Sequence, residues 1–154
     1  MRLWHYRLLP VLPKSQLLAQ WRELNSIFVN QPRHILINYV YDYPKSDLKL
    51  YSDIVVAELR RRRYAVSDKA LGNFKAYFGE APDPFAPNQF AKPFQRHHDS
   101  EYLAVCFCNL LEKYRRGQAD FDCDTFQEVE RVCRQATING RRIMPDRVER
   151  LVIG

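Results

Sequence analysis

The stretch SQLLAQWRELNSIFV, residues 15–29, constrains the fold more than any other part of this chain. At 3.6 residues per turn, its large apolar side chains fall on one side of a helix. This stripe consists of Leu17, Leu18, Trp21, Leu24 and Phe28. Glu23 falls on the opposite side with Gln16, Ala19 and Ser26, and Arg22 lies at the edge. Because prolines flank the stretch on both sides, the pattern predicts an amphipathic helix over residues 15–29.

Helical spacing of apolar residues recurs along the rest of the chain and predicts a mainly α fold. We expect further helices over residues 47–62, 97–118 and 124–140, and a short last helix over 145–152. The aromatic segment 38–43 is a candidate for extended structure. Residues 72–96 hold four of the nine prolines and five phenylalanines, which predicts a long irregular loop that packs its rings on the body. Residues 119–154 are then a helical C-terminal extension.

The composition is that of a compact single domain over residues 1–154. Hydrophobic residues make up 46% and charged residues 27%, and the net charge is +6. This excess permits a polyanion as partner without requiring one. The chain has no apolar run of roughly 20 residues and no secretory pattern, so we expect a cytoplasmic protein with no membrane partner.

The four cysteines do not form a recognised metal-binding pattern, and we expect them to be reduced and packed as small apolar residues. The arginine run at residues 60–63 allows two interpretations. In the first interpretation, the arginines stabilise the C-terminal end of a helix through the helix dipole. In the second, they contact phosphates of a nucleic acid.

Several motifs resemble one known family. QLLAQWREL, followed by FVNQPRH, resembles the first long helix of the phage-type pyrimidine-dimer DNA glycosylases, the endonuclease V family. LKLYSDIVVAELRRRRYAV resembles its next helix, and HHDSEYLAVCFCNLLEKYRRGQ resembles its third helix more loosely. The start MRLWHYRLLPVLPKSQLL is most similar to bacterial relatives of those enzymes. The resemblance covers residues 1–66 and 97–118, and implies the compact helical fold of that family.

The resemblance also implies an unusual nucleophile, the α-amino group of the first residue. This amine attacks C1′ of the damaged nucleotide, the base leaves, an imine forms with the opened sugar, and β-elimination cuts the strand. Arg2 is too large to permit removal of the preceding methionine, so the expected nucleophile is the amine of Met1. An α-amine titrates near pH 8, so a useful fraction is unprotonated at neutral pH.

Glu23 matches the family's catalytic glutamate, which stabilises charge on the sugar and moves protons. The resemblance assigns contacts with double-stranded, damaged or abasic DNA to Arg2, Gln16, Arg22, Arg33 and His34, and implies no metal or other cofactor. The family has a histidine at the position of Gln16 and an arginine at that of Ser26. These departures leave two alternatives, a non-catalytic nucleic-acid-binding relative and a helical protein-interaction module.

Overall fold

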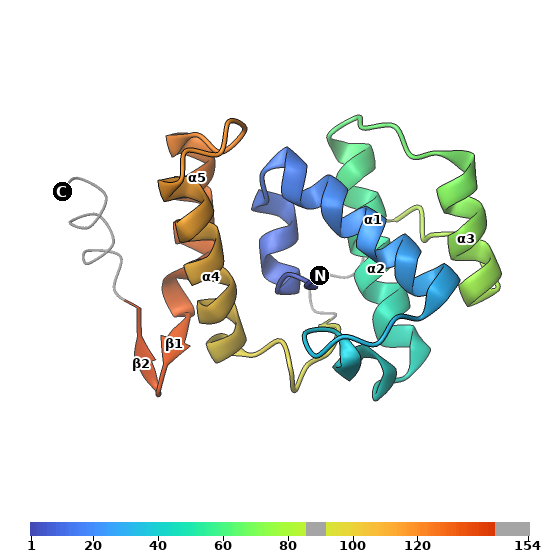
Figure 1. Ribbon diagram of the computed structural model, residues 1–154, viewed down its shortest axis with the longest axis horizontal. Coiled ribbons are helices and arrows are strands. Elements are labelled where there is room, and N and C mark those ends of the chain that lie inside the picture. Colours follow the sequence, from blue (N-terminus) through green and yellow to red (C-terminus); the bar gives the residue numbers. More distant parts are fainter. Residues whose placement is uncertain (86–91, 144–154) are drawn as a thin grey trace.

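The structure, a computed structural model, describes residues 1–85 and 92–143 (Figure 1). Within these residues the chain forms five α-helices, three 3-10 helices and one short hairpin, so the predicted mainly α fold is confirmed. The helices are η1 (Tyr6–Val11), α1 (Lys14–Asn30), η2 (Asn38–Tyr41), α2 (Lys45–Arg61), α3 (Asp68–Phe78), α4 (Ser100–Arg115), α5 (Cys123–Val132) and η3 (Cys133–Gln135). The hairpin pairs β1 (Thr137–Ile138) with β2 (Arg141–Arg142) in antiparallel register.

Helix α1 lies at the centre of the N-terminal part of the fold and packs against both α2 and α3 (Figure 1). The predicted stripe accounts for this position, because Leu17, Trp21, Leu24 and Phe28 are all buried. The 3-10 helix η1 contacts α2 on one side and α5 on the other. It therefore connects the N-terminal part of the fold to the α4–α5 pair.

The predicted irregular loop over residues 72–96 is wrong in its first part, because residues 72–78 belong to α3. Ser67 caps this helix by accepting a hydrogen bond from the Ala70 N–H, and Gly79 ends it with a left-handed backbone at φ 77°. The Phe74 ring is fully buried on the α1 side of the core, where it meets Phe28 edge-on. A glycine at position 72 is tolerated because packing of these rings outweighs its helix propensity.

The C-terminal extension is less helical than predicted. Helix α5 starts after Asp122, whose carboxylate accepts from the Thr125 N–H, and it ends at Val132 instead of continuing to residue 140. Asn139 and Gly140 both have positive φ, which suits the two central residues of a tight hairpin turn. The segment 38–43, a candidate for extended structure, contains η2 instead. The predicted helix over 145–152 lies outside the described residues.

Asp120 supplies a cap that α1 lacks in its own sequence. Pro13 stands at the N-cap position of α1 and has no side-chain acceptor. The Asp120 carboxylate accepts hydrogen bonds from the Ser15 N–H at 2.7 Å and the Ser15 hydroxyl at 3.0 Å. Partial burial raises the pKa of this carboxyl, but hydrogen bonds from Ser15 and Gln118 outweigh it and hold the pKa below its usual range. The extension therefore stabilises the first turn of α1.

Replacing Asp120 by alanine is expected to lower the free energy of unfolding by about 1 kcal/mol at pH 7, the size of a typical cap reduced by solvent screening. Because the pKa of Asp120 is lower in the folded state, its carboxylate stabilises the fold above the unfolded-state pKa, near pH 4. This contribution is lost as the pH falls through the folded-state pKa. Urea unfolding at pH 7 and pH 3 should thus show the gap between wild type and variant narrowing in acid. Asp42→Ala, at an exposed position outside the α-helices, is the control.

Candidate active site

The first five residues lie against α1 and α2 through their own backbone. The Trp4 N–H donates to Gln20 Oε1 of α1 at 2.8 Å, and the Trp4 carbonyl accepts from the Tyr51 hydroxyl of α2 at 2.7 Å. Leu3 is fully buried, and its carbonyl accepts from the Tyr102 hydroxyl of α4. The start of the chain is thus held at a defined place by three helices.

Glu23 lies directly beside this segment. Its Oε2 atom accepts hydrogen bonds from the Arg2 N–H at 3.1 Å and from Gln20 Nε2 at 3.2 Å. The Arg2 nitrogen is part of the peptide that joins it to Met1, so the α-amine of Met1 is one residue from the atom bound by the carboxylate. The opposite side of the predicted helix therefore faces the N-terminal segment at Glu23 rather than only solvent.

The charge state of Glu23 reflects these neighbours. Burial raises the pKa of its carboxyl above the usual range. The Arg2 N–H, the positive charge of the Met1 amine, the Gln20 amide and the Arg22 charge each act in the opposite direction, in decreasing order. A carboxyl with a raised pKa takes up a proton more readily than an exposed glutamate does, which suits proton exchange.

A cluster of buried rings lies behind the N-terminal segment. His98 Nδ1 accepts from the Tyr6 N–H at 3.2 Å, so its Nε2 carries the proton and donates to the Tyr39 hydroxyl at 2.7 Å. Burial lowers the pKa of His98 to about 2 and that of His5 to about 4. Both imidazoles are therefore neutral at physiological pH and act as packing and hydrogen-bonding groups, not as phosphate-binding cations.

Two residues predicted to contact DNA are engaged within the protein. Gln16 is only 8% exposed, and its amide forms a reciprocal pair of hydrogen bonds with Gln118, at 2.8 and 2.7 Å. Any contact between Gln16 and DNA requires this pair to separate. The Arg2 side chain interacts with Tyr102 and Cys106 of α4. The start of α1 is thus covered by Gln118, just before the C-terminal extension, which the sequence analysis did not anticipate.

The other predicted DNA contacts are exposed. Arg22 projects from α1 next to Glu23 in sequence, and its charge acts on that carboxyl. Arg33 and His34 lie on the turn that follows α1, where the Arg33 guanidinium sits 4.2 Å from the centre of the Tyr41 ring. The His34 N–H donates to Asn38 Oδ1 at 2.8 Å, which holds this turn in shape. These three side chains are available to an external polyanion.

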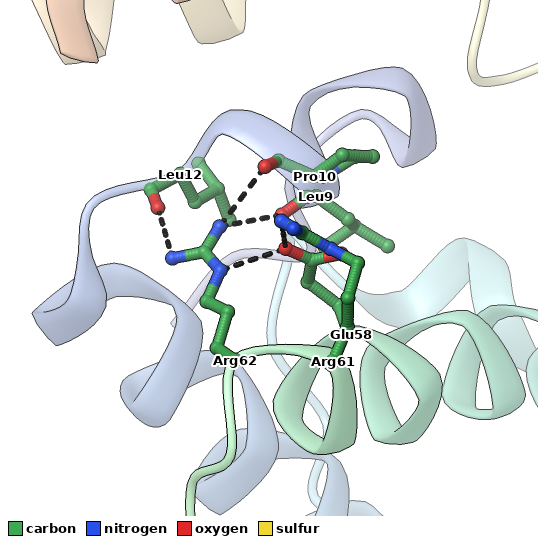
Figure 2. Close-up of polar contacts among 6 residues, drawn as sticks. All are labelled: Leu9, Pro10, Leu12, Glu58, Arg61 and Arg62. Atoms are coloured by element: carbon green, nitrogen blue, oxygen red, sulfur yellow. Dashed lines mark hydrogen bonds and ion pairs between the residues drawn. The ribbon is translucent and has the colours of Figure 1, made fainter.

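The arginine run divides between the two interpretations. Figure 2 shows that Arg61 and Arg62 both reach Glu58, a residue of α2 that is 6% exposed. Arg62 also donates to the carbonyls of Leu12, at 2.7 Å, and Pro10, at 3.1 Å, at the end of η1 (Figure 2). Arg62 is therefore used in holding η1 on α2, whereas Arg61 pairs with Glu58 within α2. Arg60 and Arg63 are exposed.

Sequence reasoning missed Gln20, Tyr51 and Tyr102, which hold the N-terminal segment. Gln20 carried a usable signal, because a polar residue three positions after Leu17 and four before Leu24 interrupts the apolar stripe. Tyr51 and Tyr102 carried no such signal, since an aromatic residue at helical spacing is predicted to be part of the hydrophobic core. In the described residues the cysteines are free, no metal-binding cluster occurs, and no helix is long and apolar enough to cross a bilayer.

The fold thus places a half-buried carboxylate beside its first residues, and the exposed Arg22 precedes this carboxylate in α1. A family model described as pyrimidine dimer DNA glycosylase matches residues 1–71. The match confirms the predicted resemblance for this part of the chain and contains Glu23, Gln20 and the N-terminal segment. No curated protein sequence and no solved structure matches the chain.

Proposed function

We propose that the protein is a DNA glycosylase with abasic-site lyase activity, acting on damaged double-stranded DNA through an imine formed by the α-amine of Met1. The observation that carries this proposal is the hydrogen bond from the Arg2 N–H to Glu23 Oε2, which holds the carboxylate one residue from Met1. The family match over residues 1–71 supports the glycosylase class.

The amine lone pair forms a bond to C1′ as the bond from C1′ to the base breaks. The base leaves with the electron pair of the broken bond and takes up a proton. The amine nitrogen loses its proton, and the sugar ring opens at the C1′–O4′ bond to give the imine, with O4′ protonated. Removal of a C2′ proton then expels the 3′ phosphate, and water releases the sugar from the amine. Each step moves a proton, which a carboxyl with the raised pKa of Glu23 can carry.

Glu23 has a second role in this proposal, since its negative charge stabilises positive charge that develops on the sugar. Arg22, Arg33 and His34 are exposed and contact phosphates, which orients the strand. Arg2 and Gln16 contribute by direct contact with DNA only where their present partners release them.

Borohydride trapping tests the mechanism. Untagged protein, shown by mass spectrometry to begin with a free Met1 amine, is mixed with duplex DNA carrying a single abasic site and reduced with borohydride. We expect a covalent adduct on a denaturing gel and a modified Met1 in the N-terminal peptide. Failure to trap an adduct with such a chain would overturn the lyase assignment.

The Gln16–Gln118 pair specifically favours a second candidate, a nucleic-acid-binding protein without catalysis. Gln118 closes over Gln16, the position at which the family carries a histidine, and this arrangement suits a surface that no longer needs that side chain. DNA binding that weakens steeply with salt, together with no trapped adduct, would support this candidate. No binding at physiological salt would favour a protein-interaction module.

A further inference from the structure

We propose that Gln20 is a positioning residue that fixes the Glu23 carboxylate against the N-terminal segment and leaves Glu23 Oε1 as the oxygen that exchanges protons. This inference rests on the proposed function, because it assigns a role within the same site. It concerns a buried side chain that acts through Glu23.

Gln20 is 1% exposed and uses both ends of its amide. Its Oε1 accepts from the Trp4 N–H at 2.8 Å and is also 2.8 Å from the Tyr51 hydroxyl. Its Nε2 donates to the Arg2 carbonyl at 3.1 Å and to Glu23 Oε2 at 3.2 Å. One side chain therefore joins two residues of the N-terminal segment to the carboxylate.

The orientation of this amide is fixed by its partners. A backbone N–H only donates, so the Trp4 nitrogen must face Oε1. A carbonyl and an ionised carboxylate only accept, so Arg2 O and Glu23 must face the Nε2 protons. Reversing the amide would place two acceptors against an oxygen and a donor against the NH2 group. The folded chain therefore presents an N–H to Glu23 whenever Glu23 is ionised.

The two oxygens of Glu23 consequently differ. Oε2 accepts from both the Arg2 N–H and Gln20 Nε2. Within residues 1–85 and 92–143, no donor forms a hydrogen bond with Oε1. A proton binds more readily to an oxygen that is not already facing two donors, so Oε1 is the atom that accepts and releases protons during the reaction.

The contact with Gln20 also favours the ionised carboxylate, since it lowers the pKa of Glu23 against the raising effect of burial. Removing the N–H should therefore make Glu23 protonate at higher pH. The expected consequence is a selective loss of activity on the acidic side of the pH profile, which a purely structural role of Gln20 would not produce.

The test compares pH profiles of abasic-site cleavage under single-turnover conditions for wild type, Gln20→Met and Tyr51→Phe. For Gln20→Met, we expect the cleavage rate relative to wild type to be about tenfold lower at pH 6 than at pH 8.5. A change of this size corresponds to the loss of one hydrogen bond to a charged group. Tyr51→Phe is the control for a loosened N-terminal segment, because it removes contacts with the Gln20 amide and the Trp4 carbonyl but leaves the Glu23 contact in place. Its rate should therefore fall by the same factor at every pH, so that its acidic limb lies at the same pH as that of wild type.

Gln20→Glu keeps an acceptor for the Trp4 N–H and replaces the N–H donor by a second carboxyl. This variant is the alternative test of the positioning role if Gln20→Met does not fold. It should shift the acidic limb in the same direction, because two adjacent carboxyls resist ionisation together. If wild type forms a trapped adduct and both Gln20 variants keep its pH profile, the positioning role is wrong and the proposed function stands. If wild type forms no adduct, the proposed function itself fails.

Discussion

Replacing Glu23 by glutamine is expected to reduce cleavage at an abasic site by about 100-fold or more, the usual contribution of a general acid or base. Glutamine has the same size, and its oxygen can still accept from the Arg2 N–H, so the N-terminal segment should stay in place. What is lost is the negative charge and the ability to exchange a proton. Single-turnover cleavage of a duplex with one labelled strand measures the effect.

Glu112→Gln is the matched control for this variant. Glu112 is an exposed carboxylate of α4 that pairs with Arg116, and it lies on a different element from the candidate site. Its replacement should leave cleavage unchanged. A loss of less than threefold in Glu23→Gln, with wild type active, would show that the carboxylate takes no part in the chemistry.

The pH profile adds an independent check on Glu23. Burial raises the pKa of its carboxyl, so the reactive carboxylate is present above that raised value and is lost as the pH falls through it. Wild-type cleavage should therefore decline on the acidic side at a higher pH than an exposed glutamate would give. The Glu23→Gln variant should lack this limb in whatever activity remains.

The sequence predicted the parts of the fold that follow from local spacing. The stripe from Leu17 to Phe28 placed α1 within about one residue of its bounds, and the same reasoning located α2 within two residues and α4 within three. These features depend on the period of the helix and on capping residues, which are written directly in the chain. Local spacing did not show that Glu23, on the predicted polar side, is half-buried against the N-terminal segment.

The parts that failed depend on contacts between distant segments. Gln16 is at a polar position of the helix, but a residue 102 positions away buries it, and no local pattern encodes that pairing. The helix predicted over 124–140 ran to Asn139–Gly140, although an Asn-Gly pair also suits a hairpin turn. Likewise, Gly72 was taken as the start of a loop because propensity does not show how strongly Phe74 is buried.

Replacing Glu58 by glutamine is expected to lower the free energy of unfolding by about 3 kcal/mol, because it leaves a largely buried arginine without its counterion. Glu58 Oε1 accepts from Arg62 Nε at 2.7 Å, and the Arg62 side chain is only 16% exposed (Figure 2). The same guanidinium holds the Leu12 and Pro10 carbonyls, so its orientation fixes the end of η1 on α2. The melting temperature should fall by about 10 °C.

Glu128→Gln provides a control with the same local geometry. Glu128 and Arg131 of α5 form an ion pair at i,i+3 spacing, as Glu58 and Arg61 do, but both of its side chains are more than half exposed. An exposed pair contributes about 0.5 kcal/mol or less, so this variant should melt close to wild type. Equal shifts in the two variants would show that Glu58 acts as a surface charge.

The contrast between these two pairs also decides how the arginine run should be interpreted. If Glu58→Gln loses far more stability than Glu128→Gln, Arg62 is required by the fold, and its replacement would weaken DNA binding through unfolding as well as through charge. The exposed Arg60 and Arg63 then become the positions at which a phosphate contact can be measured cleanly. If one of these arginines contacts a phosphate, its replacement by alanine should reduce the slope of log affinity against log salt by about 1 and leave the melting temperature unchanged.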